Sequence, residues 1–173
     1  AYIAMIYIGF NISGSHYNPV ISAIMFLKKK IDIKDFILYI VFQIIGACLA
    51  ATSIAMMKSN IQIQPVLADS IYTVIFMEAI FSFFIILAYL RVTSDDLKKN
   101  SFYGFIIGLP LIVGIFSAAP VTGAVFNPAI SIGPSIIDIL TNEGVSQYFT
   151  WYYVVGPFLG GIGAYLLNKL FEK

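Results

Sequence analysis

The chain has 173 residues, of which 60% are hydrophobic and 11% are charged, and its mean hydropathy is +0.90. A soluble domain of this size needs more polar residues to cover its surface, so the composition indicates a membrane protein. The formal net charge of +1 gives no electrostatic reason to expect nucleic acid as a partner. Cys48 and His16 are the only cysteine and histidine and make no ligand set, so we expect no metal or other cofactor.

Residues 1–12 are apolar and predict the end of a membrane-spanning helix. The chain opens at Ala1 inside this segment, without a methionine or a charged leader. Half of a membrane helix leaves backbone groups that lipid cannot satisfy, so we expect the rest of this helix to precede residue 1.

Four later stretches are long and apolar enough to cross a bilayer, which takes about 20 residues in a helix. The crossings are residues 36–57, 70–90, 101–119 and 148–170. The polar connections are residues 58–69, 91–100 and 141–147. We therefore expect an all-α membrane protein.

One ten-residue pattern occurs twice, at residues 13–22 and 122–131, as [Ser/Thr]-Gly-[Ser/Ala]-x-aromatic-Asn-Pro-x-Ile-Ser. In each copy, or box, the Asn suits a helix N-cap, and the Pro suits the first helical position, where its missing N–H costs nothing. Each box therefore predicts a helix that begins abruptly at this point. The caps are Asn18 and Asn127, and the prolines are Pro19 and Pro128.

The helices that follow the two boxes are expected to be short. Apolar residues continue only to Lys28 after the first box and to Asp138 after the second. About ten helical residues cover roughly half of a 30 Å hydrocarbon core. Two such half-helices, one from each face of the membrane, would meet at the midplane.

The boxes lie 109 residues apart, and an odd number of predicted crossings separates them. They therefore point in opposite directions, as in an inverted-topology repeat. We expect a single domain over residues 1–173, in which residues 1–60 are the remainder of a first repeat and residues 69–173 are a second.

Basic residues indicate the orientation in the membrane. If the first half-helix enters from the cytoplasm, nine of the ten basic residues lie inside, and only Lys58 lies outside. The basic loops and the C-terminus are then cytoplasmic. The three lysines at 28–30 are interpreted as a solvated helix end, with binding of lipid head groups as the alternative. The inside residues are Lys28, Lys29, Lys30, Lys34, Arg91, Lys98, Lys99, Lys169 and Lys173.

Paired Asn-Pro-Ala-type boxes on half-helices resemble the aquaporin, or major intrinsic protein, family. Gln43 within Tyr39–Ala47, Glu78 in its span, and Val155–Gly161 also resemble that family, and the match covers nearly all of the chain. The resemblance implies an aquaporin-like fold of transmembrane helices with two re-entrant half-helices, from which the first span is absent here. It also implies a homotetramer in the cell membrane, in which each protomer contains its own pore.

Irregular backbone at membrane depth is tolerated only where it lines a polar cavity. The loops 13–17 and 122–126, which include Gly14, Gly123 and Val125, are therefore expected to present carbonyl acceptors along a pore. Asn18 and Asn127 would cap their helices through the side-chain oxygen and offer amide donors to a passing solute. Partial positive charge at two helix N-termini disfavours cations at that point.

Three polar side chains near the boxes have supporting or alternative roles. Within the resemblance, Glu78 holds the carbonyl acceptors in place through buried N–H groups, and Gln43 has a similar supporting role. A proton-relay role is the alternative for Glu78. His16 is expected to be a passive part of the pore wall, with titration and gating as the alternative.

The predicted selectivity filter departs from the family pattern. The family has Arg directly after Asn-Pro-Ala, whereas this chain has Ile130, and the other matching positions are Ile115 and Ala124. A fourth filter residue would precede Ala1. An aliphatic constriction lacks a cationic barrier, so water specificity is in doubt, although Ser131–Pro134 resembles the water branch.

The sequence thus predicts a passive channel for water and other small uncharged solutes, with the lipid bilayer as its surroundings. The alternatives are a facilitator of glycerol, ammonia or urea, and a non-conducting structural relative closed by dewetting of the aliphatic constriction. An enzyme is not expected, because the chain has no Gly-x-Ser-x-Gly and no nucleophile with a base in reach.

Overall fold

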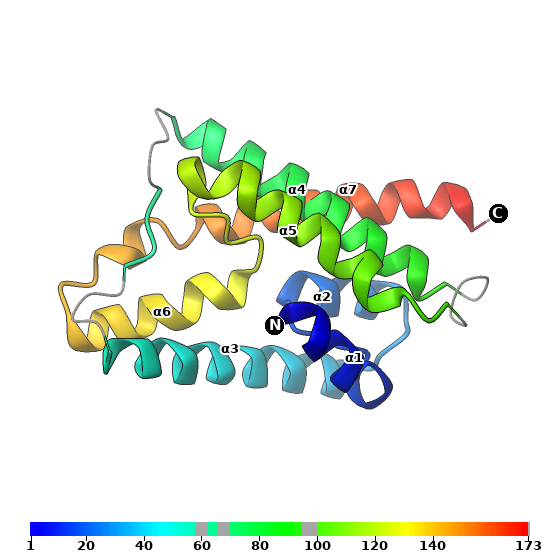
Figure 1. Ribbon diagram of the computed structural model, residues 1–173, viewed down its shortest axis with the longest axis horizontal. Helices are drawn as coiled ribbons and strands as arrows, with labels where there is room; N and C mark the ends of the chain where they lie inside the picture. Colours follow the sequence, from blue (N-terminus) through cyan, green and yellow to red (C-terminus); the bar gives the residue numbers. More distant parts are fainter. Residues whose placement is uncertain (58–61, 66–69, 95–99, 173) are drawn as a thin grey trace.

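A computed structural model describes residues 1–57, 62–65, 70–94 and 100–172 (Figure 1). Within these residues all regular structure is helical, which confirms the expected all-α class. The helices are α1 (Tyr2–Ser13), α2 (Pro19–Leu27), α3 (Ile33–Ala55), α4 (Ile71–Val92), α5 (Tyr103–Thr122), α6 (Pro128–Thr141), the 3₁₀ helix η1 (Val145–Tyr148) and α7 (Tyr152–Phe171).

Four of these helices, α3, α4, α5 and α7, are long and apolar enough to cross a membrane. Their bounds follow the predicted crossings except at the last one, which begins at Tyr152 rather than Tyr148. The reason is local, because residues Val145–Tyr148 form a 3₁₀ turn in which the backbone of Ser146 donates to Asp138 Oδ2 and accepts from Thr150 Oγ1. Lys58, Lys98, Lys99 and Lys173 lie outside the described residues.

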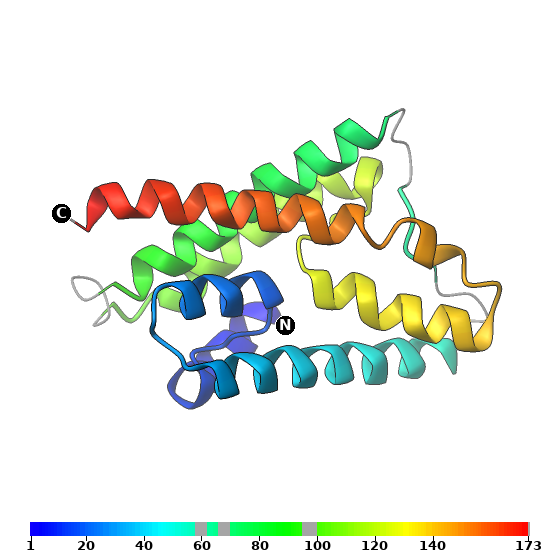
Figure 2. The ribbon, with the colours of Figure 1, turned by 180° about the vertical axis from the view of Figure 1, so that it is seen from behind.

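The half-helices begin where the two boxes predict. Asn18 Oδ1 accepts a hydrogen bond from Val20 N at 2.9 Å, and Asn127 Oδ1 accepts one from Ala129 N at 3.0 Å. A proline occupies the first turn of each helix. Both asparagines are therefore N-caps, and the two half-helices α2 and α6 leave their meeting point in opposite directions (Figure 2).

The helices form two groups on either side of the half-helices. Helices α4, α5 and α7 lie together along one side, while α3 runs along the other and packs on α6 (Figures 1 and 2). Helices α4 and α7 approach so closely that a Cβ on Gly160 would lie 2.1 Å from the Ala79 carbonyl oxygen. The close packing of α4 and α7 holds in place the helix α4, to which both box loops are hydrogen-bonded.

The outer surface is apolar. Phe116, for example, is 82% exposed on α5, and Phe76 is 64% exposed on α4. Ala51 is the only fully buried residue among the 23 residues of α3. Such a surface is unfavourable in water and suits a lipid environment.

Candidate functional site at the junction of the two boxes

The two capping asparagines link the boxes to one another. Asn18 Nδ2 donates to the Phe126 carbonyl at 2.9 Å, and Asn127 Nδ2 donates to the Tyr17 carbonyl at 2.8 Å. Both side chains are buried, with exposed fractions of 4% and 9%. Each side-chain amide therefore donates one of its two N–H groups to the opposite box. The second N–H of each asparagine remains available to a solute.

The loop 122–126 is held from behind by Glu78 of α4. Glu78 Oε1 accepts hydrogen bonds from Thr122 Oγ1 at 2.8 Å and Val125 N at 3.1 Å, and Oε2 accepts one from Phe126 N at 2.6 Å. Glu78 has no exposed surface. A carboxylate buried at membrane depth is costly unless it is fully hydrogen-bonded, and these three donors supply that compensation.

The same arrangement leaves several carbonyl groups of this loop unpaired. Ala124 N donates to Thr122 Oγ1 at 3.0 Å, so the N–H groups of residues 124–126 all point toward the Glu78 side. Ala124 and Phe126 adopt left-handed φ angles of 54° and 51°. In the described part of the chain, the carbonyl oxygens of Gly123, Ala124 and Val125 accept no hydrogen bond.

The loop 13–17 is held through its carbonyl groups instead. Tyr89 Oη donates to Gly14 O at 2.8 Å, and Gln43 Nε2 donates both to His16 O and, at 2.9 Å, to Ser22 Oγ. Tyr17 O accepts from Asn127 as described above. Ser15 O also accepts from Tyr17 N at 2.8 Å, so four of the acceptors expected along the pore from this loop are already engaged, each retaining a second lone pair.

His16 belongs to this loop, and only 6% of its surface is exposed. Its ring makes edge contacts with Tyr39 and Tyr89, with centroid distances of 4.9 and 5.9 Å. Nδ1 has no hydrogen-bond partner among the described residues. His16 and Gln43 both line a cavity of about 430 Å³ that opens between α1 and α3.

The predicted filter residues are only partly brought together. Ile130 and Asn127 line one cavity of about 370 Å³, to which Tyr17 and Gln43 also contribute. Ile115 and Ala124 do not line this cavity, and Ile115 is 43% exposed on α5.

The remaining predicted residues contribute to the site through their backbone conformation rather than through their side chains. The Val125 side chain packs against Val74 and Tyr153, so only its main chain can face a solute. Gly14 and Gly123 end α1 and α5 with φ angles of 66° and 87°, which favour glycine. Pro19 and Pro128 start the half-helices, as expected.

Two tyrosines were missed by sequence reasoning. Tyr153 Oη donates to Thr122 O at 2.6 Å, and Tyr89 holds Gly14 in the corresponding way at the other box. A usable signal was present, because a tyrosine inside a membrane span needs an acceptor for its hydroxyl group. The box loops are the irregular backbone at that depth and offer such acceptors.

Comparison with known proteins agrees with this geometry. Residues 1–168 match the family described as Major intrinsic protein. The chain is 34% identical to glycerol uptake facilitator protein-like 6 of Lactiplantibacillus plantarum, with 87% of this chain and 71% of that protein covered.

Plant relatives are also similar. Aquaporin NIP3-1 of Arabidopsis thaliana is 29% identical, with 96% and 53% covered, and nodulin-26 of Glycine max is 29% identical, with 95% and 60% covered. The chain thus spans between 53% and 71% of the length of these three relatives. The family match, the two linked boxes and the all-helical fold lead to one conclusion: the chain belongs to the major intrinsic protein family, whose members include the aquaporins.

Proposed function

We propose that this chain forms most of a passive transmembrane channel for water and other small uncharged solutes. The observation that carries the proposal is the junction of the boxes, where Asn18 and Asn127 each keep one amide N–H beside the unpaired carbonyl groups of residues 123–125. A solute with a hydroxyl group can accept from the first and donate to the second. The names of relatives, an aquaporin and a glycerol uptake facilitator, support the same class of solute.

Rejection of cations follows from the same junction. The N-termini of α2 and α6 meet there, and each carries a partial positive charge of about +0.5. The three unpaired carbonyl groups of residues 123–125 are too few to replace the hydration shell of a cation. We therefore expect neutral solutes to pass while protons and cations do not.

The aliphatic filter is proposed to admit solutes larger than water. Ile130 is 49% exposed and shares a cavity with Asn127, in the position where the family has an arginine. Replacing it as Ile130→Arg should narrow the passage and lower the glycerol-to-water permeability ratio by about tenfold, the scale on which a small change in an apolar pocket discriminates. An unchanged ratio in this variant would show that Ile130 is not part of the filter.

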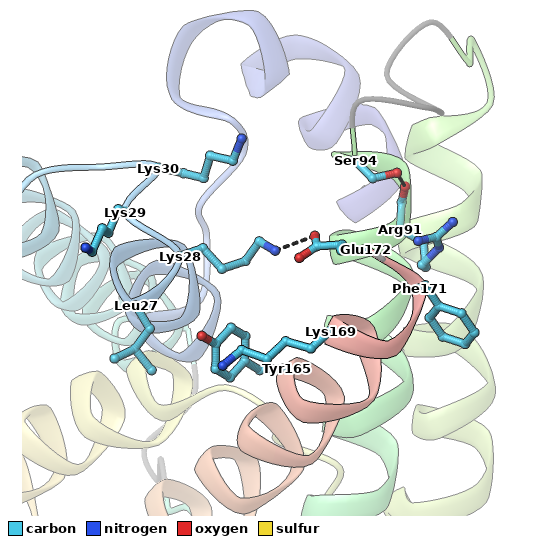
Figure 3. A pocket seen from close by; sticks show the side chains of 10 residues that line it. All are labelled: Leu27, Lys28, Lys29, Lys30, Arg91, Ser94, Tyr165, Lys169, Phe171 and Glu172. Carbon is cyan, nitrogen blue, oxygen red and sulfur yellow. Dashed lines mark hydrogen bonds and ion pairs between the residues drawn. The ribbon is translucent and has the colours of Figure 1, made fainter.

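The proposed organisation has two repeats, with residues 1–60 as the remainder of the first and residues 69–173 as the second. A homotetramer in the cell membrane, with a pore in each protomer, is proposed from family membership. The cytoplasmic side is proposed to be the end where α2, α4 and α7 finish, because five basic side chains gather there (Figure 3).

The test is stopped-flow light scattering on liposomes that contain the full-length protein, first in a sucrose gradient and then in a glycerol gradient. Fast shrinkage in sucrose is expected, followed by re-swelling as glycerol enters. Shrinkage without re-swelling would restrict the channel to water. No response above that of empty liposomes would overturn the proposal.

A further inference from the structure

A basic cavity of about 600 Å³ lies where α2, α4 and α7 end (Figure 3). It shares no lining residue with the cavities at the box junction. Its basic lining comes from three separate segments of the chain. These residues are Lys28, Lys29, Lys30, Arg91 and Lys169.

Charge in this cavity is strongly unbalanced. Among the described lining residues, Glu172 is the only acidic one, which leaves four positive charges in excess. Its Oε1 accepts from Lys28 Nζ at 2.5 Å and from Asn168 Nδ2 at 2.9 Å. The hydrogen bond from Lys28 lowers the pKa of the Glu172 carboxyl, so this group is ionised at neutral pH. One carboxylate thus pairs with one lysine, and no other lining cation forms an ion pair within the part of the chain that the structure describes.

Arg91 adds a second, independent observation. Its Nη1 is buried and has no hydrogen-bond partner among the described residues. The guanidinium carbon lies 5.2 Å from the centroid of the Phe171 ring, which holds the group beside the cavity. A buried guanidinium N–H without an acceptor is unfavourable, and an anion in the cavity would satisfy it.

Compensation of helix dipoles explains part of this arrangement but not all of it. Lysine and arginine near a helix C-terminus are favoured by the partial negative charge there. That effect falls off within the last turn and does not require basic residues of three helices to surround one hollow. Positive charges gathered around a concave site raise the local concentration of anions.

We propose that this cavity binds a phosphate group, carried either by a membrane phospholipid or by a soluble phosphate. Phosphate suits the site because it offers several acceptor oxygens and more than one negative charge to Lys30, Lys169 and Arg91. Glu172 competes with it for Lys28. The proposal takes up the alternative of head-group binding by the lysine triplet, because the fold adds Arg91 and Lys169 to the same cavity. The proposal does not depend on conduction.

The test measures binding to the purified full-length protein from the shift in its thermal unfolding temperature, since a ligand of the folded state raises that temperature. One series uses inorganic phosphate in detergent. The other uses nanodiscs of phosphatidylcholine with and without phosphatidylinositol 4-phosphate. Stabilisation by both probes, or by one of them, supports the site and identifies the source of the phosphate. No stabilisation by either probe overturns the proposal.

Three variants make the test specific. The double variant Lys30→Gln with Lys169→Gln should weaken binding by about tenfold or more, because it removes two charge-assisted hydrogen bonds. Glu172→Gln should tighten binding, since the competing carboxylate is gone, whereas a purely structural ion pair predicts no gain. Lys34→Gln, an exposed lysine outside the cavity, is the matched control and should change nothing. Equal losses in the control and the double variant would contradict the assignment.

Discussion

Loops 13–17 and 122–126 share one sequence pattern, and in each a tyrosine hydroxyl donates to a carbonyl group at the start of the loop. They differ in what holds the rest of the backbone. In the second loop, N–H groups donate to the buried carboxylate of Glu78. In the first loop, carbonyl groups accept from side chains such as Gln43.

This difference decides which loop keeps unpaired carbonyl groups. A carboxylate that collects N–H groups leaves the carbonyl groups free, as at residues 123–125. An amide donor that binds carbonyl groups occupies them. The same box pattern therefore leaves three unpaired carbonyl groups in one loop, whereas the carbonyl groups of the other are more fully engaged.

The largest effect is expected from removing the carboxylate. Glu78→Ala would leave the Thr122 hydroxyl and two backbone N–H groups without their acceptor, at a cost of about 1–3 kcal/mol for each unsatisfied buried group. We expect a lower unfolding temperature in detergent and loss of water permeability. Glu78→Gln, which keeps one acceptor oxygen, should lie between this variant and the wild type. A Glu78→Ala protein as stable as the wild type would show that the carboxylate does not hold the loop.

A smaller effect is expected at the first loop. Gln43→Leu removes the donor to His16 O and Ser22 Oγ, with a stability loss of about 1–2 kcal/mol, since the lost bonds are neutral. Water permeability should fall less than in Glu78→Ala because the free carbonyl groups of the second loop remain. Thermal unfolding and stopped-flow light scattering measure the two quantities. A greater loss of permeability than in Glu78→Ala would reverse the assigned roles of the loops.

The smallest effects should come from deleting one hydroxyl group at each box. Tyr89→Phe and Tyr153→Phe each remove one hydrogen bond, worth about 1 kcal/mol. Tyr153→Phe should be the milder change because Glu78 still anchors the second loop by three bonds. The pair is its own control, since both variants lose the same chemical group. A milder Tyr89→Phe variant would contradict this order.

Local signals in the sequence predicted most of the fold. Apolar runs placed the spans, and the Asn-Pro steps placed the starts of α2 and α6, because both signals act over a few neighbouring residues. Contacts between residues far apart in the chain were not predictable in this way. The donation from Asn18 to Phe126, the anchoring tyrosines and the basic cavity each depend on how distant segments pack.

The predicted filter residues also show that position in the sequence does not determine which side chains lie together. Counting from Asn127 selected Ile115, Ala124 and Ile130, yet only Ile130 shares the cavity with that asparagine. Counting along the chain reproduces position in a pattern but not the direction of each side chain. The role of Ile115 and Ala124 therefore stays a prediction.

The central claim, that solutes pass through the junction of the boxes beside Ile130, is tested most directly by blocking that point. The measurement is osmotic water permeability of liposomes containing the Ile130→Trp protein, with Leu140→Trp as the control on the same helix, where the side chain is 73% exposed. We predict permeability near that of empty liposomes for Ile130→Trp and near that of the wild type for Leu140→Trp. Equal, undiminished permeability in both variants would contradict the account.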